Sequence, residues 1–298
     1  MPEKDSSNNK PIQTSSVALP PEKLVVEGLC PSYQLSELVL PTNLIEPLKG
    51  LPSIFYINMD RSTDRETHMQ SLFQHSVFKN IEITRISGID GKKNDTDNYL
   101  DFYQCAKNPN MMSSEYGCTI SHFRAIHHAA MTDDPYSLIL EDDASIEFLP
   151  YWKKTIEQLV TDAPPDWEVI QLSYILFDTL PEKEYEVWEM KKSFCGTAAY
   201  LIKNSAAKRL IQYLCRNSSP AMPRYCIGYE YPYYHHADRF LYCFFKTYSY
   251  HCPFFTYRDH NDSYIHPDHV DFHSESKEKT KKLIGTYGIG TQGSNKTS

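Results

Sequence analysis

Residues 136–145 read Tyr-Ser-Leu-Ile-Leu-Glu-Asp-Asp-Ala-Ser, a short apolar run that ends abruptly in three carboxylates. A short apolar run bounded by polar residues is typical of a buried strand in a mostly parallel sheet. In open α/β sheets, ligands bind beyond the carboxyl ends of the strands, which is where Glu141, Asp142 and Asp143 fall. The stretch therefore predicts an α/β fold whose chemistry takes place at this strand end.

The three adjacent carboxylates repel one another and favour a compensating cation. Hard oxygen ligands suit Mg²⁺ or Mn²⁺, ions that usually also contact substrate phosphates. The acids are therefore interpreted as a platform for a metal ion and a phosphate group. The alternative is a solvated acidic turn, because clusters of charge mostly lie on protein surfaces.

Length, charge and cysteine usage set limits on the class of protein. The chain has 298 residues, enough for one large α/β domain or two small ones. Its net charge of −8 argues against non-specific binding of nucleic acid, which needs a basic surface. None of the eight cysteines forms a Cys-x-x-Cys pair, so no structural zinc site is expected and the cysteines are most simply free thiols. We see no signal-peptide pattern and no apolar run long enough to span a membrane, so we expect a soluble, cytoplasmic protein.

The order of expected elements alternates between strand and helix, which is the pattern of a parallel-sheet α/β domain. Strands are expected at 54–57, 81–86, 138–140, 167–172 and 197–202, and helices at 62–78, 115–131, 148–160, 204–215 and 237–245. We expect residues 1–18 to form a disordered tail, residues 19–275 a single domain, and residues 276–298 a partly disordered tail.

Two arginines follow the first expected strand. Arg61 and Arg65 lie one turn apart on one face of the next helix. A strand, a polar loop and a helix N-terminus form the geometry that receives a nucleotide phosphate, so both arginines are candidates for binding an anion. The alternative is an exposed helix face on which they pair with Asp64 and Glu66. His122, taken alone, is typical of a structural histidine.

Tyrosine and histidine crowd the region 224–273. Their flat apolar faces and polar tips suit stacking on a sugar or a nucleobase. An aromatic core beneath an irregular loop explains the same composition equally well.

Five segments, taken together and in order, carry a resemblance to a known family. They are Tyr56-Ile-Asn-Met-Asp-Arg-Ser-Thr-Asp-Arg65, Gly117-Cys-Thr-Ile-Ser-His122, Leu138-Ile-Leu-Glu-Asp-Asp143, Thr197-Ala-Ala-Tyr200, and Ala237-Asp238 with Leu241. Over about residues 52–250 the chain resembles glycosyltransferase family 25, which includes lipooligosaccharide and procollagen galactosyltransferases. It departs from the family pattern at Met59, where leucine is usual, and in lacking a proline before Asp238.

This resemblance implies a fold of the GT-A type, an α/β/α sandwich around a mixed, mostly parallel sheet. It implies a UDP-galactose or UDP-glucose donor and an acceptor hydroxyl on a glycan or a collagen-type hydroxylysine. With Mn²⁺ or Mg²⁺ as cofactor, we assign Glu141 and Asp143 as metal ligands. The donor side is assigned to Asn58, Asp60, Arg61, Arg65, Ser121, His122 and Asp142.

Inversion at the sugar carbon requires a general base, for which we choose Asp238, with Glu230 in reserve. Two other classes of protein remain as alternatives. One is a metal-dependent phosphohydrolase or nucleotidyltransferase, and the other is a non-catalytic sugar-binding relative.

Overall fold

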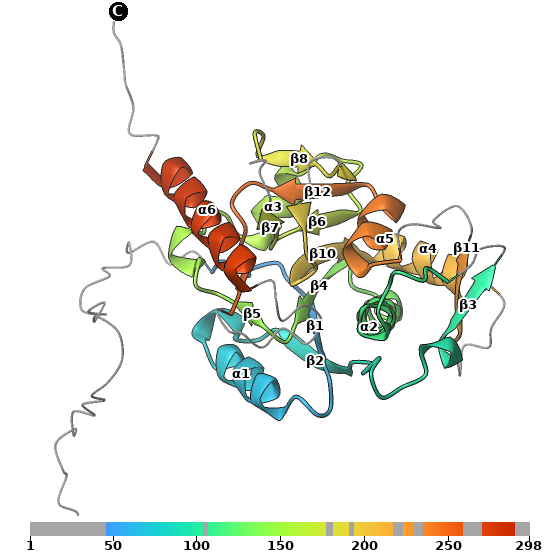
Figure 1. Ribbon diagram of the computed structural model, residues 1–298. Coiled ribbons are helices and arrows are strands. Elements are labelled where there is room, and N and C mark those ends of the chain that lie inside the picture. The colour runs from blue at the N-terminus through green and yellow to red at the C-terminus, as the bar shows by residue number, and fades with distance from the viewer. Residues whose placement is uncertain are drawn as a thin grey trace, which may run out of the picture. The chain divides into compact units, whose positions relative to one another are not determined.

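The computed structural model describes residues 46–103, 107–176, 181–190, 194–216, 223–228, 235–258 and 270–289, all within the unit Ile45–Ser298 (Figure 1). The strands are β1 Ser53–Asn58, β2 Glu82–Ser87, β3 Leu100–Tyr103, β4 Tyr136–Glu141, β5 Ala144–Ser145, β6 Val169–Gln171, β7 Ile175–Leu176, β8 Tyr185–Val187, β9 Phe194–Cys195, β10 Ala199–Lys203, β11 Tyr225–Gly228, β12 Thr247–Tyr250 and β13 Thr256–Tyr257. The helices are α1 Thr63–Phe73, α2 Ser113–Ala130, α3 Ile156–Asp162, α4 Asn204–Leu214, α5 Ala237–Phe244 and α6 Val270–Ile289, with 3₁₀ turns η1 Ser76–Phe78, η2 Thr96–Asn98 and η3 Leu149–Tyr151.

A seven-stranded sheet forms the centre of the described residues, in the order β2-β1-β4-β10-β6-β12-β8. The strands β2, β1 and β4 pair in parallel, and β6 and β12 also pair in parallel. Between these groups β10 runs antiparallel to both of its neighbours, and β8 runs antiparallel to β12 at the edge. The expected mixed, mostly parallel sheet is therefore confirmed.

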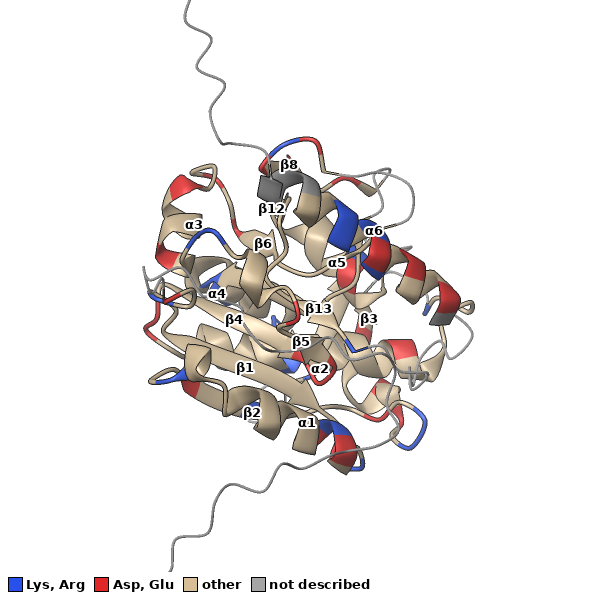
Figure 2. Ribbon diagram, turned by 90° about the vertical axis from the view of Figure 1, so that its left-hand side faces the viewer, with Lys and Arg blue, Asp and Glu red and all other residues tan. Residues whose placement is uncertain are grey.

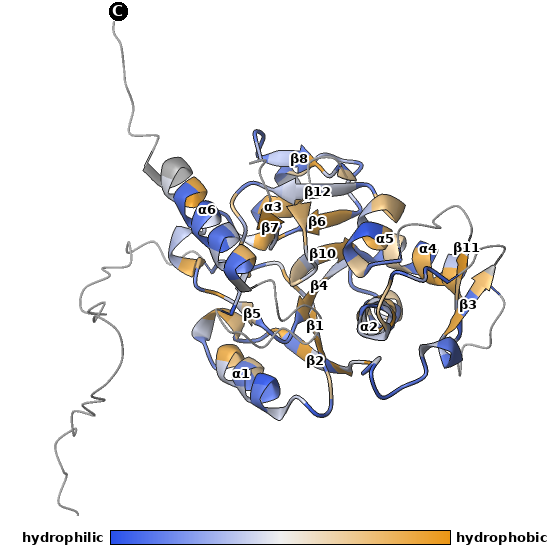
Figure 3. Ribbon diagram, viewed as in Figure 1, coloured by the Kyte–Doolittle hydropathy of each residue, from blue (hydrophilic) through white to orange (hydrophobic). Residues whose placement is uncertain are grey.

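Both faces of the sheet are covered by helices, because the side chains of each strand alternate between the two faces. In β1, Ile54 and Tyr56 join a core cluster with side chains of α1, α3 and α6, whereas Phe55 and Ile57 join a second cluster with α2, α4 and α5. Figure 1 shows α1 and α6 on one side of the sheet and α2, α4 and α5 on the other. Figure 3 shows apolar residues concentrated in the central strands and polar residues along α6. The α/β/α sandwich is thus confirmed.

The sheet gains β8 and β12, which were not among the expected strands, and three expected segments differ in their helices. The helix expected over 62–78 runs only from Thr63 to Phe73 and is followed by a separate 3₁₀ turn, so Arg65 lies on the helix but Arg61 precedes it. The segment 148–160 is also not one helix, because Thr155 and Gln158 form a capping box that starts α3 anew after η3. The helix α6 runs through the domain boundary expected at residue 275. It buries Lys277 and Ile284 against the domain, so the residues described beyond 275 are not a tail.

The fold brings the carboxyl ends of β1, β2 and β4 to one edge of the sheet, and the start of α2 packs against this edge. At Gly117 a Cβ atom would lie 2.6 Å from the carbonyl oxygen of Ile89 and 2.7 Å from the amide nitrogen of Gly91. The Ser121 hydroxyl accepts a 2.8 Å hydrogen bond from the Ile89 N–H. Glycine at position 117 therefore lets α2 approach the turn after β2 closely enough for both to border one site.

Candidate functional site

The acidic stretch at the end of β4 turns inward onto a buried arginine, and Figure 2 shows it as the red turn between β4 and β5. An oxygen of Asp142 lies 2.6 Å from Arg65 Nη1, and the other accepts a 2.8 Å hydrogen bond from Asn58 Nδ2. The Arg65 side chain is only 8% exposed. Burial raises the pKa of Asp142 above its usual value, although Arg65 and Asn58 act in the opposite direction. Both oxygens of Asp142 are thus engaged, and the carboxylate holds the Arg65 guanidinium in place.

Glu141 and Asp143, on either side, remain partly exposed at 26% and 28% of their side chains. Asp143 Oδ2 lies 3.8 Å from Arg65 Nη1. Glu141 Oε1 accepts a 2.6 Å hydrogen bond from the Thr197 hydroxyl. Burial alone would raise the pKa of Glu141, but His122, Thr197 and Arg65 together hold it below its usual value. Both carboxylates are thus held by neighbouring side chains and remain accessible to solvent.

A cavity of about 110 Å³ opens beside these acids. Its walls combine apolar residues, two arginines, a lysine and the acidic stretch. It is lined by Ile57, Met59, Arg61, Arg65, Ile89, Asp90, Gly91, Lys92, Ser114, Cys118, Ser121, His122, Glu141, Asp142 and Asp143. The structure therefore brings the predicted acids and both predicted arginines to one hollow, as the metal–phosphate interpretation requires.

The turn after β2 contributes a second charged pair to the cavity. Asp90 accepts hydrogen bonds from Arg61 Nε and from the Lys92 N–H. Burial raises the pKa of Asp90, but these donors outweigh it and leave that pKa below its usual value. Asp90 thereby fixes the Arg61 guanidinium at the cavity wall.

Two of the predicted donor-side residues have mainly supporting contacts. Asn58 Oδ1 accepts hydrogen bonds from Arg85 Nε and Nη2 at 2.9 and 2.8 Å, while its amide holds Asp142. Asp60 bonds to Arg85 and to the Ser87 hydroxyl, and these hydrogen bonds lower its pKa. Its side chain is 73% exposed, and it is not among the residues that line the cavity. The structure thus places Asp60 beside the site, on the β2 side.

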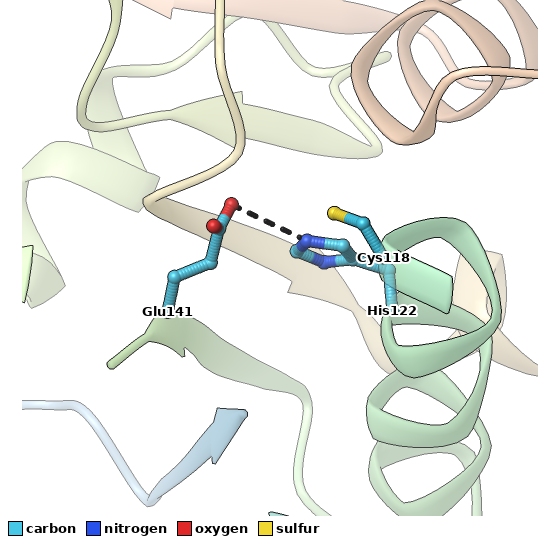
Figure 4. A group of neighbouring side chains, drawn as sticks. All are labelled: Cys118, His122 and Glu141. Atoms are coloured by element: carbon cyan, nitrogen blue, oxygen red, sulfur yellow. Dashed lines mark ion pairs between the residues drawn. The ribbon is translucent and has the colours of Figure 1, made fainter. Parts of the chain in front are cut away.

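A cysteine, a histidine and a glutamate among the lining residues lie close to one another (Figure 4). Cys118 and His122 extend from α2 and Glu141 from the end of β4, and their ligand atoms all lie within 4.8 Å of one another. His122 Nδ1 is 3.0 Å from the Tyr200 hydroxyl, and Nε2 is 3.4 Å from Glu141 Oε1. Burial raises the pKa of the Cys118 thiol well above its usual value, and Glu141 adds to this effect. The group is a possible set of ligands for a metal ion.

Of the two candidate bases, Asp238 lies within the described residues and Glu230 lies outside them. Asp238, in the first turn of α5, accepts hydrogen bonds from the N–H groups of Gly196 at 3.1 Å and Arg239 at 2.7 Å. It is not among the residues that line the cavity, but its charge acts on Cys118. Ser121 lines the cavity, but its hydroxyl donates to the Gly117 carbonyl and accepts from the turn after β2.

Sequence reasoning missed Asp90, Lys92 and Cys118 as residues of this cavity. A signal for Asp90 was present, because it follows the second strand, and the carboxyl ends of parallel neighbours meet at one sheet edge. Cys118 stands within the quoted motif, but only the three-dimensional structure brings it to Glu141.

Known proteins support a family assignment. The sequence profile of glycosyltransferase family 25, described as an LPS biosynthesis protein, matches residues 51–224, more than half of the chain. The chain belongs to glycosyltransferase family 25. It is 26% identical over 187 residues to a glycosyltransferase 25 family member of Aedes aegypti, and 25% identical over 189 residues to procollagen galactosyltransferase 2 of Mus musculus. These alignments cover 55% and 54% of the chain but only 28% of each relative, so this family 25 chain matches less than a third of their length.

Among solved structures, this family 25 chain is similar to a glycosyltransferase involved in the glycosylation of the major capsid of PBCV-1. The TM-score is 0.36 and the identity 11%, with 78% of this chain and 99% of the other covered. None of the helices in the described ranges combines the length and apolar character needed to cross a membrane.

Proposed function

We propose that the protein is an inverting glycosyltransferase. It moves a hexose, galactose or glucose, from a UDP-sugar to an acceptor hydroxyl with the help of Mn²⁺ or Mg²⁺. The acceptor is a glycan or a collagen-type hydroxylysine. Membership of family 25 and the name of the mouse relative, procollagen galactosyltransferase 2, support this proposal.

The observation that carries the proposal is the buried Arg65–Asp142 pair, which lines a cavity together with Arg61, Glu141 and Asp143. Removing a charged pair from water is costly, and a purely structural core rarely needs one. Here the pair lies at the carboxyl edge of a parallel strand group, where open α/β sheets bind nucleotides. The remaining cationic groups on the wall, Arg61 and Lys92, suit the negative charge of a diphosphate.

The donor set fits the proposed cofactor. Glu141 and Asp143 offer carboxylate oxygens to the cavity, and hard divalent ions prefer such ligands. Asp142 is kept on the donor side rather than among the metal ligands, because Arg65 and Asn58 already contact its two oxygens. When bound, Mn²⁺ or Mg²⁺ would act as a Lewis acid toward the diphosphate of the leaving UDP.

For deprotonation of the acceptor hydroxyl we retain Asp238, with Glu230 in reserve. Asp238 belongs to α5, and its carboxylate is held by two backbone N–H groups. Its charge acts on Cys118, a residue of the cavity wall.

The decisive experiment measures UDP release from UDP-galactose and UDP-glucose with collagen-peptide or glycan acceptors, in the presence and absence of Mn²⁺. We expect Asp143→Asn to lower the transfer rate on the order of a thousandfold, because one charge-stabilising contact at the leaving group is removed. The matched control is Asp64→Asn, an exposed acid on α1 whose loss leaves the rate unchanged.

Normal transfer by Asp143→Asn at saturating Mn²⁺ would exclude the metal assignment. For Asp238→Asn we expect a lower kcat with intact UDP binding, and loss of UDP binding would give Asp238 a structural role instead. If neither UDP nor Mn²⁺ raises the melting temperature of the wild-type chain, the proposal fails, because a ligand that binds only the native state must raise it.

A further inference from the structure

We propose that Cys118, His122 and Glu141 form a binding site for a thiophilic divalent cation, of which Zn²⁺ is the biological example. The three side chains supply one sulfur, one nitrogen and one oxygen ligand, and the fourth position faces the cavity. This site is distinct from the carboxylate pair proposed for Mn²⁺ or Mg²⁺, with which it shares Glu141.

The spacing of the ligand atoms supports the site. Zinc–sulfur and zinc–nitrogen bonds of about 2.3 and 2.0 Å at tetrahedral angles place two ligand atoms roughly 3.5 Å apart. His122 Nε2 lies 3.4 Å from Glu141 Oε1, and all three ligand atoms lie within 4.8 Å of one another. A small side-chain rotation is sufficient to close the set around one ion.

The backbone already favours this arrangement. Cys118 and His122 are four residues apart on α2, so their side chains leave the same face of the helix one turn apart (Figure 4). Pairs of ligands at this spacing are a recurring helical motif for zinc. Glu141 approaches from the end of β4, which fixes it independently of the helix.

His122 is the second observation that points to a ligand. The residue is only 1% exposed, and within the described part of the chain its Nε2 atom makes no hydrogen bond. The contact with Glu141 Oε1 is an ion pair at 3.4 Å, longer than an ordinary hydrogen bond, and Figure 4 marks it with a dashed line. A buried polar atom without a hydrogen bond is costly, and a metal ion at this position would satisfy it.

Neighbouring side chains contact His122 and Glu141 in the way that second-layer residues usually orient the ligands of a metal ion. The Tyr200 hydroxyl lies 3.0 Å from His122 Nδ1, so Nδ1–H can donate to it and leave the Nε2 lone pair toward the cation. The Thr197 hydroxyl fixes the Glu141 carboxylate at 2.6 Å. The carboxylates of Asp143 and Asp238 also act electrostatically on Cys118, which adds attraction for a cation.

The ligand chemistry selects the class of ion. Thiolate and imidazole ligands favour Zn²⁺ over Mg²⁺ and Mn²⁺, which prefer oxygen ligands. As the zinc–sulfur bond forms, the Cys118 thiol proton leaves to solvent. Because Glu141 belongs to both sites, an ion held by the thiolate withdraws one ligand from the Mn²⁺ or Mg²⁺ position. Zinc is therefore expected to compete with the catalytic ion.

The test measures metal binding alone, so its outcome does not depend on the proposed transfer reaction. Co²⁺ is titrated into the metal-free full chain, where a thiolate-to-cobalt charge-transfer band reports binding through sulfur, and Zn²⁺ is then used to displace it. We expect Cys118→Ser to remove the band and to weaken Zn²⁺ binding more than roughly a hundredfold. Tyr200→Phe should weaken it by roughly 10- to 100-fold, as loss of an outer contact does. Cys243→Ser, which alters a cysteine outside the cavity lining, is the matched control and should leave both measurements unchanged.

Protection of Cys118 in the unmodified chain provides an independent measurement. Zn²⁺ should slow alkylation of Cys118, followed by peptide mass spectrometry, whereas the same concentration of Mg²⁺ should not. Wild-type Zn²⁺ affinity in Cys118→Ser would overturn the proposal, and so would alkylation of Cys118 at the same rate with and without Zn²⁺. The alkylation result decides the question even if the Cys118 variant does not fold.

Discussion

Replacing Arg65 by methionine separates a buried ion pair and leaves most of the hydrocarbon volume in place. In the wild-type chain Arg65 lies 2.6 Å from Asp142, and both side chains are less than a tenth exposed. The variant keeps the hydrogen bond from Asn58 to Asp142 but removes the only opposite charge that contacts Asp142 among the ion pairs of the described residues. The carboxylate must then remain buried and charged or take up a proton.

These two possibilities set the expected loss in the free energy of unfolding of Arg65→Met. Breaking a buried pair by removing one partner typically costs about 3–5 kcal/mol. Protonating a carboxyl of ordinary pKa at pH 7 costs about 4 kcal/mol, at 1.36 kcal/mol per pH unit. The variant cannot lose more stability than this through Asp142, because the carboxylate would take up a proton instead. At pH 5 this maximum loss of stability is about 1.5 kcal/mol. We therefore expect Arg65→Met to lower the free energy of unfolding by about 3–4 kcal/mol at pH 7 and by less than half of that at pH 5.

The sign of this pH dependence follows from the direction of the pKa. A carboxyl whose folded-state pKa is raised binds its proton more readily in the native state, so its native state loses stability as the pH rises. Burial already raises the pKa of Asp142 in the wild-type chain, and the loss of Arg65 raises it further. The deficit of Arg65→Met should therefore shrink as the pH falls.

Urea unfolding at pH 5, 6 and 7 measures the effect. The matched control is Arg61→Met, whose side chain is 31% exposed against 8% for Arg65, so its loss should cost less. The double variant Arg65→Met/Asp142→Asn should recover much of the stability, because no buried charge remains. Equal costs for the two arginine variants, or a cost for Arg65→Met that does not change with pH, would refute a buried, charged Asp142.

Three further outcomes are expected from urea unfolding. Gly117→Ala should lower the free energy of unfolding by about 2–4 kcal/mol, because its Cβ meets backbone atoms at 2.6 and 2.7 Å. Gly285→Ala, with open space around it, should raise that free energy by up to about 1 kcal/mol. Asp90→Asn should destabilise the protein at pH 7, and the deficit should close as the pH falls below about 5, because a carboxyl of lowered folded-state pKa loses its stabilising effect in acid. Lys277→Ala should cost about 2–4 kcal/mol, because the lysine is 3% exposed and lies 2.6 Å from Glu147.

Much of the site could be predicted from the sequence because its residues stand at the ends of predictable elements. Glu141, Asp143 and the two arginines follow strands, and the carboxyl ends of parallel strands meet at one edge. Asp238 illustrates the limit of this reasoning. Its place in a short helix was predictable, but its distance from the acidic stretch depends on how α5 packs. That Glu141 and Asp143 bind a metal ion stays a prediction.

The sequence by itself determined the α/β class, the first strand–helix unit and the family, because local apolar periodicity and short motifs carry that information. Only the tertiary structure decided that Asp142 pairs with Arg65, that α6 packs against the domain beyond residue 275, and that Cys118 lies near Glu141. The physical reason is the range of the interactions. Backbone periodicity acts over a few neighbouring residues, whereas these contacts join positions far apart in the chain. They form only when the helices settle on the two faces of the sheet.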